Sequence, residues 1–408
     1  MEISNFSKLL GDYLLTMKRA VVVPGKKETV GPLVVISQLP PPHHGSTVMT
    51  QVFLETLDSL GVDWHLVDRR FSKKVGDVGR FSLLKIVKSI GLLGRLITVH
   101  LRRKPQAYVL FITNRPASFL VDWMMIELLR TLRRPIVNYV HTSGFSDLAK
   151  KNRIFKVLVR RALGAAKMTI CLGDALVKDV SWASHGTIRR IPNTPYRLPT
   201  KAAAVRCTAP KFVFLSNLLP GKGAPDFIEA AIGVASVESS AKFVVAGASP
   251  DESTRRDLRA MISRSPYSDR IDLIGQADEA TKWRLLDSSH VLVFPSTYAF
   301  EAQPLTIVEA MARGLPVIAY DTGGIRDLVE DGCTGFLIKA GDKASLTDSM
   351  VLLAKDDLLR NKFGANAAAY YETHLSRTAY STAWRSGLRE LAEDVNLTLS
   401  AIDSTVIE

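Results

Sequence analysis

Three cysteines, Cys171, Cys207 and Cys333, are all that the 408 residues contain. Their wide and irregular spacing excludes a disulfide framework and a zinc ribbon, and it is typical of a reducing cytosol. The chain also lacks any run of about 20 apolar residues, so we expect no membrane-spanning helix. Charged residues such as Glu2 and Lys8 interrupt the start, which is not typical of a signal peptide. We therefore expect a cytoplasmic protein.

The chain has no Gly-x-Gly-x-x-Gly sequence, which excludes the usual dinucleotide fingerprint. His43 and His44 are adjacent, but no third ligand follows at a recognisable spacing, so we expect no metal there. Hydrophobic residues make up 47% of the chain and charged residues 23%, as in ordinary globular proteins. Because 408 residues are too many for one ordinary core, we expect two domains of about 200 residues each.

Positive charge is concentrated in the first half of the chain. Residues 1–200 hold 31 Lys and Arg against 13 Asp and Glu, a net charge of +18. Residues 201–408 hold 22 against 27, a net charge of −5. This asymmetry indicates that the first half faces an anionic partner. A membrane surface, a phosphorylated acceptor and a nucleic acid all fit that description.

Short apolar runs alternate with helical segments along the first half. Strands are predicted at 32–37, 64–67, 107–113, 136–141, 168–172 and 188–192. Helices are predicted between them, at 45–60, 118–132 and 152–165. Such alternation predicts a parallel sheet with helices on both faces.

A proline-rich stretch, 192–210, interrupts this rhythm and has the composition of a linker. The pattern then restarts, with strands predicted at 211–215, 242–246, 271–274, 291–294, 317–319 and 335–337 and helices at 225–234 and 305–312. We expect two doubly wound α/β domains, 1–200 and 201–375. A helical stretch, 349–391, precedes a tail from 393, and we expect 376–408 to pack back on the first domain.

Residues 69–105 interleave eleven Lys and Arg with apolar side chains. A helix here would have a wide apolar face with a cationic rim. That pattern is typical of a helix lying on a membrane surface, but it also fits a core helix with solvated lysines. The charge of the first half favours membrane contact.

The most informative stretch runs from Glu301 to Glu309, two carboxylates eight positions apart. It follows a predicted buried strand, and its second half forms the start of a predicted helix. Ligands of α/β proteins bind at the carboxyl ends of parallel strands, and the unpaired N–H groups at a helix start suit a phosphate. The carboxylates themselves suit hydroxyl groups on either side of that phosphate.

Glycine-containing loops follow two other strands of the second half. Lys222 stands between Gly221 and Gly223 ahead of a helix, and Gly323 and Gly324 follow the strand at 317–319. Glycine lets the backbone approach a ligand closely, and the lysine supplies a point charge. Either loop alone is as consistent with a plain turn. Together with the loop that carries Glu301 they make three loops at strand ends, and this favours a binding site.

The first half has two comparable positions. Pro40 to Ser46 follows the first strand and opens a helix, which places the small residues Gly45 and Ser46 at the strand end. His141 ends the strand 136–141 and opens a Gly-containing loop, where it is well placed to contact substrate. A lone histidine in this setting is structural as often as functional.

Together these motifs resemble the retaining glycosyltransferases of family 4, which have the GT-B fold. The resemblance is clearest over 296–338, where Glu301 to Glu309 fits the Glu-x7-Glu motif and 314–324 and 331–337 fit the segments that follow it. It implies transfer of a sugar from a nucleotide diphosphate sugar to a hydroxyl acceptor with retention at the anomeric carbon. Synthesis of a cell-surface polysaccharide or glycolipid is the expected setting.

The resemblance also implies roles for particular residues. The catalytic set is His141 beside the reacting carbon of the sugar, Glu301 on the sugar hydroxyls and Lys222 on the diphosphate. The donor-binding residues are Asn217, Gly223, Gln303, Pro304, Leu305, Thr306, Glu309 and Gly323. Among them Glu309 binds the ribose, and the amides of 303–306 surround the diphosphate or sugar. An acceptor-side loop is implied at His44, Gly45 and Ser46.

One departure from the family pattern is Asn217, where an arginine is common, so one charge on the leaving diphosphate is missing. Lys222 and helix dipoles must then suffice, or another cation helps. No Asp-x-Asp sequence occurs, so we expect no metal at the diphosphate and no other cofactor. The family pattern offers no covalent nucleophile, and Glu301 is not expected to be one.

Two rival interpretations remain at this point. One is a GT-B nucleotide-sugar epimerase, which needs no acceptor, and the other is a non-enzymatic basic protein that binds membrane or nucleic acid. The second would not need Glu301, Glu309, Lys222 and His141 together. The expected partners are a nucleotide sugar, a glycan or lipid-linked acceptor and an anionic membrane surface, but not nucleic acid. We expect a peripheral enzyme at the inner face of the membrane.

Overall fold

The computed structural model describes residues 32–41, 45–69, 83–200 and 209–395, with only the backbone of 83–88 and 395. Contacts between Cα atoms place all of these residues in one compact unit. His44, residues 70–82 of the basic segment 69–105 and the tail beyond 395 lie outside the described residues.

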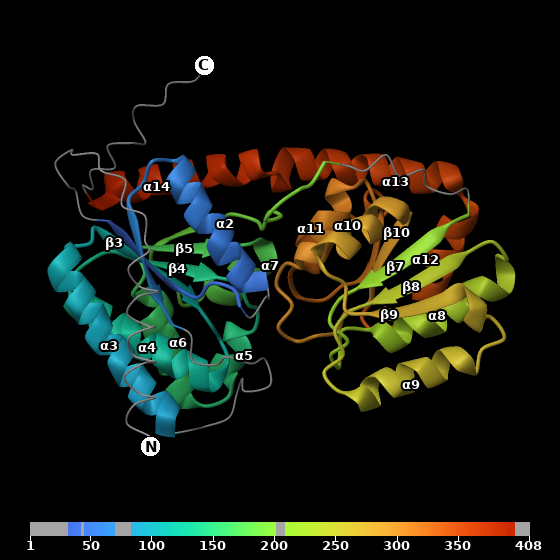
Figure 1. Ribbon diagram of the computed structural model, residues 1–408. Coiled ribbons are helices and arrows are strands. Elements are labelled where there is room, and N and C mark those ends of the chain that lie inside the picture. Colours follow the sequence, from blue (N-terminus) through green and yellow to red (C-terminus); the bar gives the residue numbers. More distant parts are fainter. Residues whose placement is uncertain (1–31, 42–44, 70–82, 201–208, 396–408) are drawn as a thin grey trace, which may run out of the picture. The chain divides into compact units, whose positions relative to one another are not determined.

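The first sheet has six parallel strands in the order β2-β1-β3-β4-β5-β6. The strands are β1 (Leu33–Ser37), β2 (Trp64–Asp68), β3 (Ala107–Ile112), β4 (Ile136–Val140), β5 (Met168–Cys171) and β6 (Thr187–Arg190). The helices are α2 (Gly45–Ser59), α3 (Leu83–Arg103), α4 (Pro116–Thr131), α5 (Phe145–Lys150), α6 (Arg153–Gly164) and α7 (Asp174–Val180). In Figure 1, α3, α4 and α6 lie together on one side of this sheet.

The second sheet also has six parallel strands, in the order β12-β11-β10-β7-β8-β9. The strands are β7 (Lys211–Leu215), β8 (Lys242–Ala246), β9 (Ile271–Gly275), β10 (Val291–Phe294), β11 (Val317–Tyr320) and β12 (Gly335–Ile338). The helices are α8 (Ala224–Val237), α9 (Glu252–Ser263), α10 (Glu279–Ser288), α11 (Leu305–Ala312), α12 (Lys343–Lys355) and α13 (Asp357–Tyr370). Short 3-10 turns are η2 (Ser268–Arg270) and η3 (Gly323–Asp327).

Both sheets reverse their strand order once, and these switch points are where open α/β sheets bind ligands. In the first sheet the reversal lies between β1 and β3, and in the second between β7 and β10. The loops that follow these four strands begin at residues 38, 113, 216 and 295. The first of them leads to Gly45, the first residue of α2, and the other three contain Asn114, Lys222 and Glu301, respectively. The fold therefore places the predicted glycine, lysine and glutamate loops at switch points.

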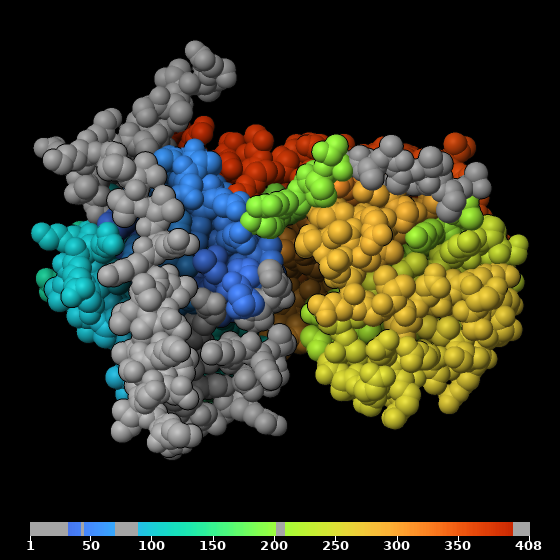
Figure 2. Space-filling view, in the orientation of Figure 1, coloured from blue at the N-terminus to red at the C-terminus, as the bar shows by residue number. Residues whose placement is uncertain are grey.

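The last helices connect the two sheets. A π-turn, η4 (Tyr371–Leu375), joins α13 to α14 (Arg377–Val395). Phe363 of α13 belongs to the hydrophobic core of the second sheet, whereas Trp384 of α14 is buried in the core of the first. Arg377 donates hydrogen bonds to the Val52 carbonyl and the Glu55 carboxylate of α2, which adjoins α14 in Figures 1 and 2. The domain limits at 200 and 375 stay predictions.

Helix α3 combines the two interpretations of the basic segment. Leu92, Leu96 and Val99 are buried in the core of the first sheet, whereas Ile90 and Leu101 are exposed. The helix is therefore a core helix on one side and leaves apolar side chains in solvent on the other. No helix among the described residues is long and apolar enough to cross a membrane.

Candidate functional site

Lys222 and Glu301 form an ion pair at the switch point of the second sheet. The Lys222 Nζ lies 2.6 Å from Glu301 Oε2, and the Ser296 hydroxyl donates to the same oxygen at 2.9 Å. The side chains of Lys222 and Glu301 are only 14% and 8% exposed. The Lys222 ammonium also lies 4.5 Å from the centre of the Tyr298 ring. Two of the three predicted catalytic residues are thus in direct contact.

The turn that carries Lys222 depends on glycine at position 223. Gly223 has a φ of 88°, a conformation that side chains other than glycine rarely adopt. A Cβ added there would lie 2.0 Å from the Pro295 carbonyl oxygen. Only glycine lets this turn pack against the end of β10. That packing positions Lys222 beside Glu301.

Gly323 plays a similar part on the other side of Glu301. Its φ is 55°, and an added Cβ would lie 2.0 Å from the Glu301 carbonyl oxygen. The neighbouring Gly324 N–H donates to that oxygen at 3.4 Å. The paired glycines therefore let η3 pack on the backbone of Glu301. Their position explains why a Gly-Gly pair follows β11.

Helix α11 begins at Leu305, as predicted, with Pro304 as its N-cap residue. No side chain caps this end, so the first N–H groups, those of Leu305 and Thr306, have no partner within the helix. Such an end carries partial positive charge and suits an anion. Lys222 pairs with Glu301, which precedes this end by four residues.

Glu309, one turn into α11, is buried and paired with a lysine that the sequence analysis missed. The Lys282 Nζ of α10 lies 2.5 Å from Glu309 Oε1. Burial raises the pKa of Glu309, and the attraction of Lys282 opposes that shift. Burial acts to lower the pKa of Lys282, but Glu309 and Glu279 outweigh it and raise that pKa. The pair is therefore a carboxylate and an ammonium held together out of water.

Gln303 connects the two halves of the chain through its buried side chain. Its Oε1 accepts from the Asn193 N–H at 2.5 Å, and its Nε2 donates to the Leu172 carbonyl at 3.3 Å. Asn193 Nδ2 in turn donates to the Gln303 carbonyl at 2.8 Å. The side chain thus ties the Glu301 loop to the loops after β5 and β6. The predicted role of its backbone amide stays a prediction.

His141 follows β4 at the corresponding edge of the first sheet. Its ring is parallel to Phe111, with centroids 5.0 Å apart, and it packs on Tyr139 at 4.1 Å. Burial lowers the pKa of His141 to about 3, so the imidazole is neutral at physiological pH. Its Nε2 is buried and has no hydrogen-bond partner among the described residues. A neutral imidazole with a free nitrogen is suited to hydrogen bonding rather than to charge.

The loop after His141 is fixed by Asp179 of α7. The Asp179 carboxylate accepts from the N–H groups of Gly144, Phe145 and Ser146, each at 2.8 Å. Three N–H donors on one carboxylate hold the start of α5 in place. The Ser143 hydroxyl then donates to the Glu301 carbonyl at 2.9 Å. The His141 loop is therefore bonded directly to the Glu301 loop.

The remaining predicted residues are less enclosed. Gly45 begins α2 and is exposed, with open space where a Cβ would stand, and Ser46 follows it as a partly buried residue. Asn217 is also exposed. His44 lies outside the described residues. The exposure of Gly45 and Asn217 is consistent with access for a substrate.

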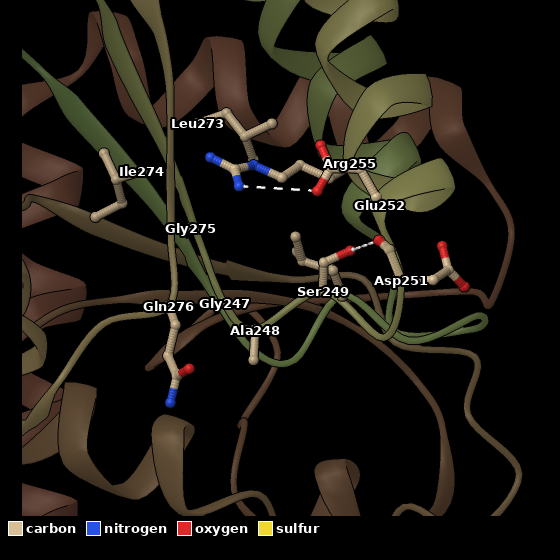
Figure 3. Close-up of a pocket in the computed structure, with 11 residues that line it drawn as sticks. Gly247, Ala248, Ser249, Asp251, Glu252, Arg255, Leu273, Ile274, Gly275 and Gln276 are labelled. Atoms are coloured by element: carbon tan, nitrogen blue, oxygen red, sulfur yellow. Dashed lines mark hydrogen bonds and ion pairs between the residues drawn. The ribbon is translucent and has the colours of Figure 1, made fainter. Parts of the chain in front are cut away.

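A cavity of about 440 Å³ lies at the carboxyl ends of β8 and β9. Residues after β7, β8 and β9 and on α9 line it, among them Leu218, Ser249, Arg255 and Gln276. Figure 3 shows Arg255 beside Glu252, at 4.0 Å, and the Ser249 hydroxyl bonded to the Asp251 carbonyl at 2.7 Å. The sequence analysis missed this cavity because its lining residues form no recognisable motif.

Residues 201–370 match the family described as glycosyl transferases group 1. The match covers 201–370 of the 408 residues, so it shows what this part of the chain is similar to. It is 31% identical over 156 residues to a phosphatidyl-myo-inositol mannosyltransferase of Mycobacterium leprae, covering 38% of this chain and 40% of that protein. It is 28% identical over 312 residues to the lipopolysaccharide core biosynthesis mannosyltransferase LpsB of Rhizobium meliloti, covering 72% and 81%. The chain spans about two fifths of the length of the first of these relatives.

Solved structures agree on the fold. Sucrose-phosphate synthase of Thermosynechococcus elongatus has a TM-score of 0.69 at 17% identity, covering 89% of this chain and all of that one. HepE of Anabaena, solved with UDP and glucose, has a TM-score of 0.65 at 18% identity, covering 88% and 100%. At such identities the likeness concerns the fold alone. It confirms the prediction of a GT-B fold with two doubly wound domains.

Proposed function

We propose that the chain is a retaining glycosyltransferase that moves a sugar from a nucleotide diphosphate sugar to a hydroxyl acceptor. The observation that carries the proposal is the buried Lys222–Glu301 pair in the loop before the uncapped start of α11. An ammonium and free N–H groups suit the diphosphate, and a carboxylate beside them suits the hydroxyls of the attached sugar. Glu309, farther along α11, suits the ribose hydroxyls.

The proposed chemistry requires no covalent intermediate on the protein. Negative charge builds on the diphosphate as it leaves, and positioned donors that face this charge lower the barrier. Lys222 and the start of α11 are the donors that we assign to this charge. The neutral His141 contributes a hydrogen bond near the reacting carbon, and a diphosphate oxygen helps to remove the acceptor proton.

The relatives support this choice of substrate class. The HepE structures were solved with UDP, with UDP-glucose and with UDP and glucose, and LpsB acts in lipopolysaccharide core biosynthesis. For this chain we infer a nucleotide sugar donor and a glycan or lipid-linked acceptor in cell-surface polysaccharide or glycolipid synthesis. An epimerase of the same fold would act without an acceptor, so a product assay separates the two.

A thermal-shift screen of nucleotide sugars tests the proposal. A ligand that binds only the folded chain stabilises it by about 2.7 kcal/mol when present at 100 times its dissociation constant. At least one nucleotide sugar should therefore raise the melting temperature more than the matching nucleotide diphosphate does. The anomeric configuration of the transferred sugar, read by NMR, should equal that of the donor. Stabilisation by none of the common nucleotide sugars, or an inverted product, would contradict the proposal.

We further propose that the first domain binds an anionic membrane surface through α3 and α6. These two helices contain nine Lys and Arg and no acidic residue. Ile154 and Val157 of α6 are 69% and 55% exposed, beside the exposed cations Arg153 and Lys156. Exposed apolar side chains rimmed by cations are typical of a surface that inserts shallowly among anionic lipids.

Replacing both Ile154 and Val157 with aspartate should reduce binding to anionic vesicles at least about tenfold, because apolar contact is lost and like charge is added. Flotation of the chain with phosphatidylglycerol vesicles at low salt measures this. Leu358→Asp is the matched control, since Leu358 is 84% exposed on α13 and far from α6 in sequence. A wild-type chain that fails to float, or an unchanged double variant, would defeat the membrane proposal.

A further inference from the structure

Asn114, in the loop after β3, is buried at 2% exposure yet uses only one end of its amide. Its Nδ2 donates to the Ser143 carbonyl, which fixes the orientation of the amide. The opposite atom, Oδ1, is buried and has no partner among the described residues. A carbonyl oxygen with two lone pairs is thus held in place without a donor.

Two more polar atoms in the neighbouring loop share this state. Thr142 Oγ1 and His141 Nε2 are buried, and neither has a partner in the part of the chain that the structure describes. A buried polar group without a partner costs folding about 1–3 kcal/mol, so native proteins contain few of them. Three of them stand together here, in two loops joined by the hydrogen bond from Asn114 to Ser143. Such groups are typical of a site whose partners arrive with a ligand.

These loops are attached to the Glu301 loop. Ser143, between Thr142 and the start of α5, donates to the carbonyls of Ala299 and Glu301 at 3.2 and 2.9 Å. Arg115, next to Asn114, donates to the Tyr298 hydroxyl at 2.7 Å. Both loops therefore hold the segment that carries Glu301, and the three free atoms lie within a few residues of these bonds.

From this arrangement we infer that Asn114 and Thr142 bind hydroxyl groups of a sugar beside His141 and Glu301. The inference rests on the proposed function. The three free groups are neutral, and Asn114 Oδ1 can only accept, so they do not suit a phosphate. A hydroxyl both donates and accepts, and a sugar offers several at fixed spacing. Asn114 Oδ1 accepts from one hydroxyl, and the Thr142 hydroxyl pairs with a second.

Thr142→Val is the sharpest test, because valine keeps the shape and removes only the free hydroxyl. Without a ligand the variant should melt at a higher temperature than wild type, since an unpaired buried group is gone. If the sugar is that of the donor, the affinity of the variant for the nucleotide sugar that the screen selects should fall about 3- to 10-fold, the value of one hydrogen bond. Its affinity for the nucleotide diphosphate should not change. Calorimetric titration of both ligands measures this difference.

The sugar that these residues contact belongs either to the donor or to the acceptor. Weaker binding of the nucleotide sugar identifies the donor. Unchanged donor affinity with a raised KM for the acceptor identifies the acceptor. Asn114→Leu should change whichever of these two constants Thr142→Val changes, the donor affinity or the acceptor KM. It should also lower the melting temperature, because the hydrogen bond to the Ser143 carbonyl is lost.

Ser289→Ala is the matched control. Ser289 Oγ is also buried without a partner among the described residues, but it precedes β10 and lies at the opposite end of that strand from Glu301. Its removal should raise the melting temperature and leave every affinity unchanged. If Thr142→Val behaves like Ser289→Ala, the inference is overturned and the proposed function stands. A wild-type chain that binds no nucleotide sugar would overturn both.

Discussion

Replacing Lys222 with alanine should reduce sugar transfer by about 10²- to 10³-fold, because under the proposed function the leaving diphosphate loses a full positive charge. The exposed Asn217 stands where an arginine is common in the family that the motifs resemble, so no cation at that position can replace the charge of Lys222. Glu301→Gln should lower turnover as well, since an amide oxygen accepts weaker hydrogen bonds from the sugar hydroxyls than a carboxylate does. Initial rates with the donor selected by the screen measure both effects.

The Lys222→Ala substitution also removes the partner of the buried Glu301 carboxylate, so folding has to be monitored separately. Glu301 is 8% exposed, and an unpaired charge at such a site destabilises a protein. The double variant Lys222→Met/Glu301→Gln removes both charges and should recover stability without recovering activity. Lys343→Ala is a control, because Lys343 and Glu229 form an exposed pair at 2.7 Å in the same domain. Near-normal turnover in the folded double variant would refute the site assignment.

Replacing Lys282 with methionine should destabilise the folded chain by about 3–5 kcal/mol at pH 8, because Glu309 then stays buried without its cation. The loss should depend on pH in a defined direction. Burial already raises the pKa of Glu309, and removal of Lys282 raises it further. A carboxyl whose pKa is higher in the folded state binds more protons there, so stability falls as the pH rises through the titration.

Chemical denaturation of the Lys282→Met variant at pH 5 and pH 8 checks this sign. The difference from wild type should be smaller at pH 5 than at pH 8, because a protonated Glu309 needs no counter-charge and the lower pH favours protonation. Lys282→Arg keeps the charge and should show a smaller loss with little pH dependence. Equal losses at both values of pH would mean that the Lys282–Glu309 attraction does not act through the charge of Glu309.

The strands were predictable because the chain builds two buried parallel sheets. Most of the twelve strands in the described part of the chain are short apolar runs bounded by turn residues, although β6 reads Thr-Ile-Arg-Arg. The predicted limits of each strand lie within two residues of the observed ones. β4 was predicted to end at His141 and ends at Val140. The helix at Leu305–Ala312 was predicted with both limits correct. Near the other end, α14 continues to Val395, beyond the predicted start of the tail at 393.

The polar partners of the site were not predictable. Lys282 and Glu309 are 27 residues apart, and Gln303 and Asn193 are 110 apart. Residue type shows that a buried glutamate needs a partner, but not which of many lysines provides it. Asp179 is a stronger example, because nothing near it in the sequence indicates that its carboxylate binds three N–H groups of the His141 loop. Such pairings follow from the tertiary arrangement alone.

The route of the last helix limits how this protein can be divided. Tyr380, Trp384 and Leu388 of α14 fill the core of the first sheet, where the Trp384 ring lies 4.3 Å from Phe53. A recombinant fragment that stops at residue 200 would therefore leave a hole in its own core and should aggregate. Grafting a different first domain onto the second domain would require exchanging two separate stretches of gene, the second encoding 377–395.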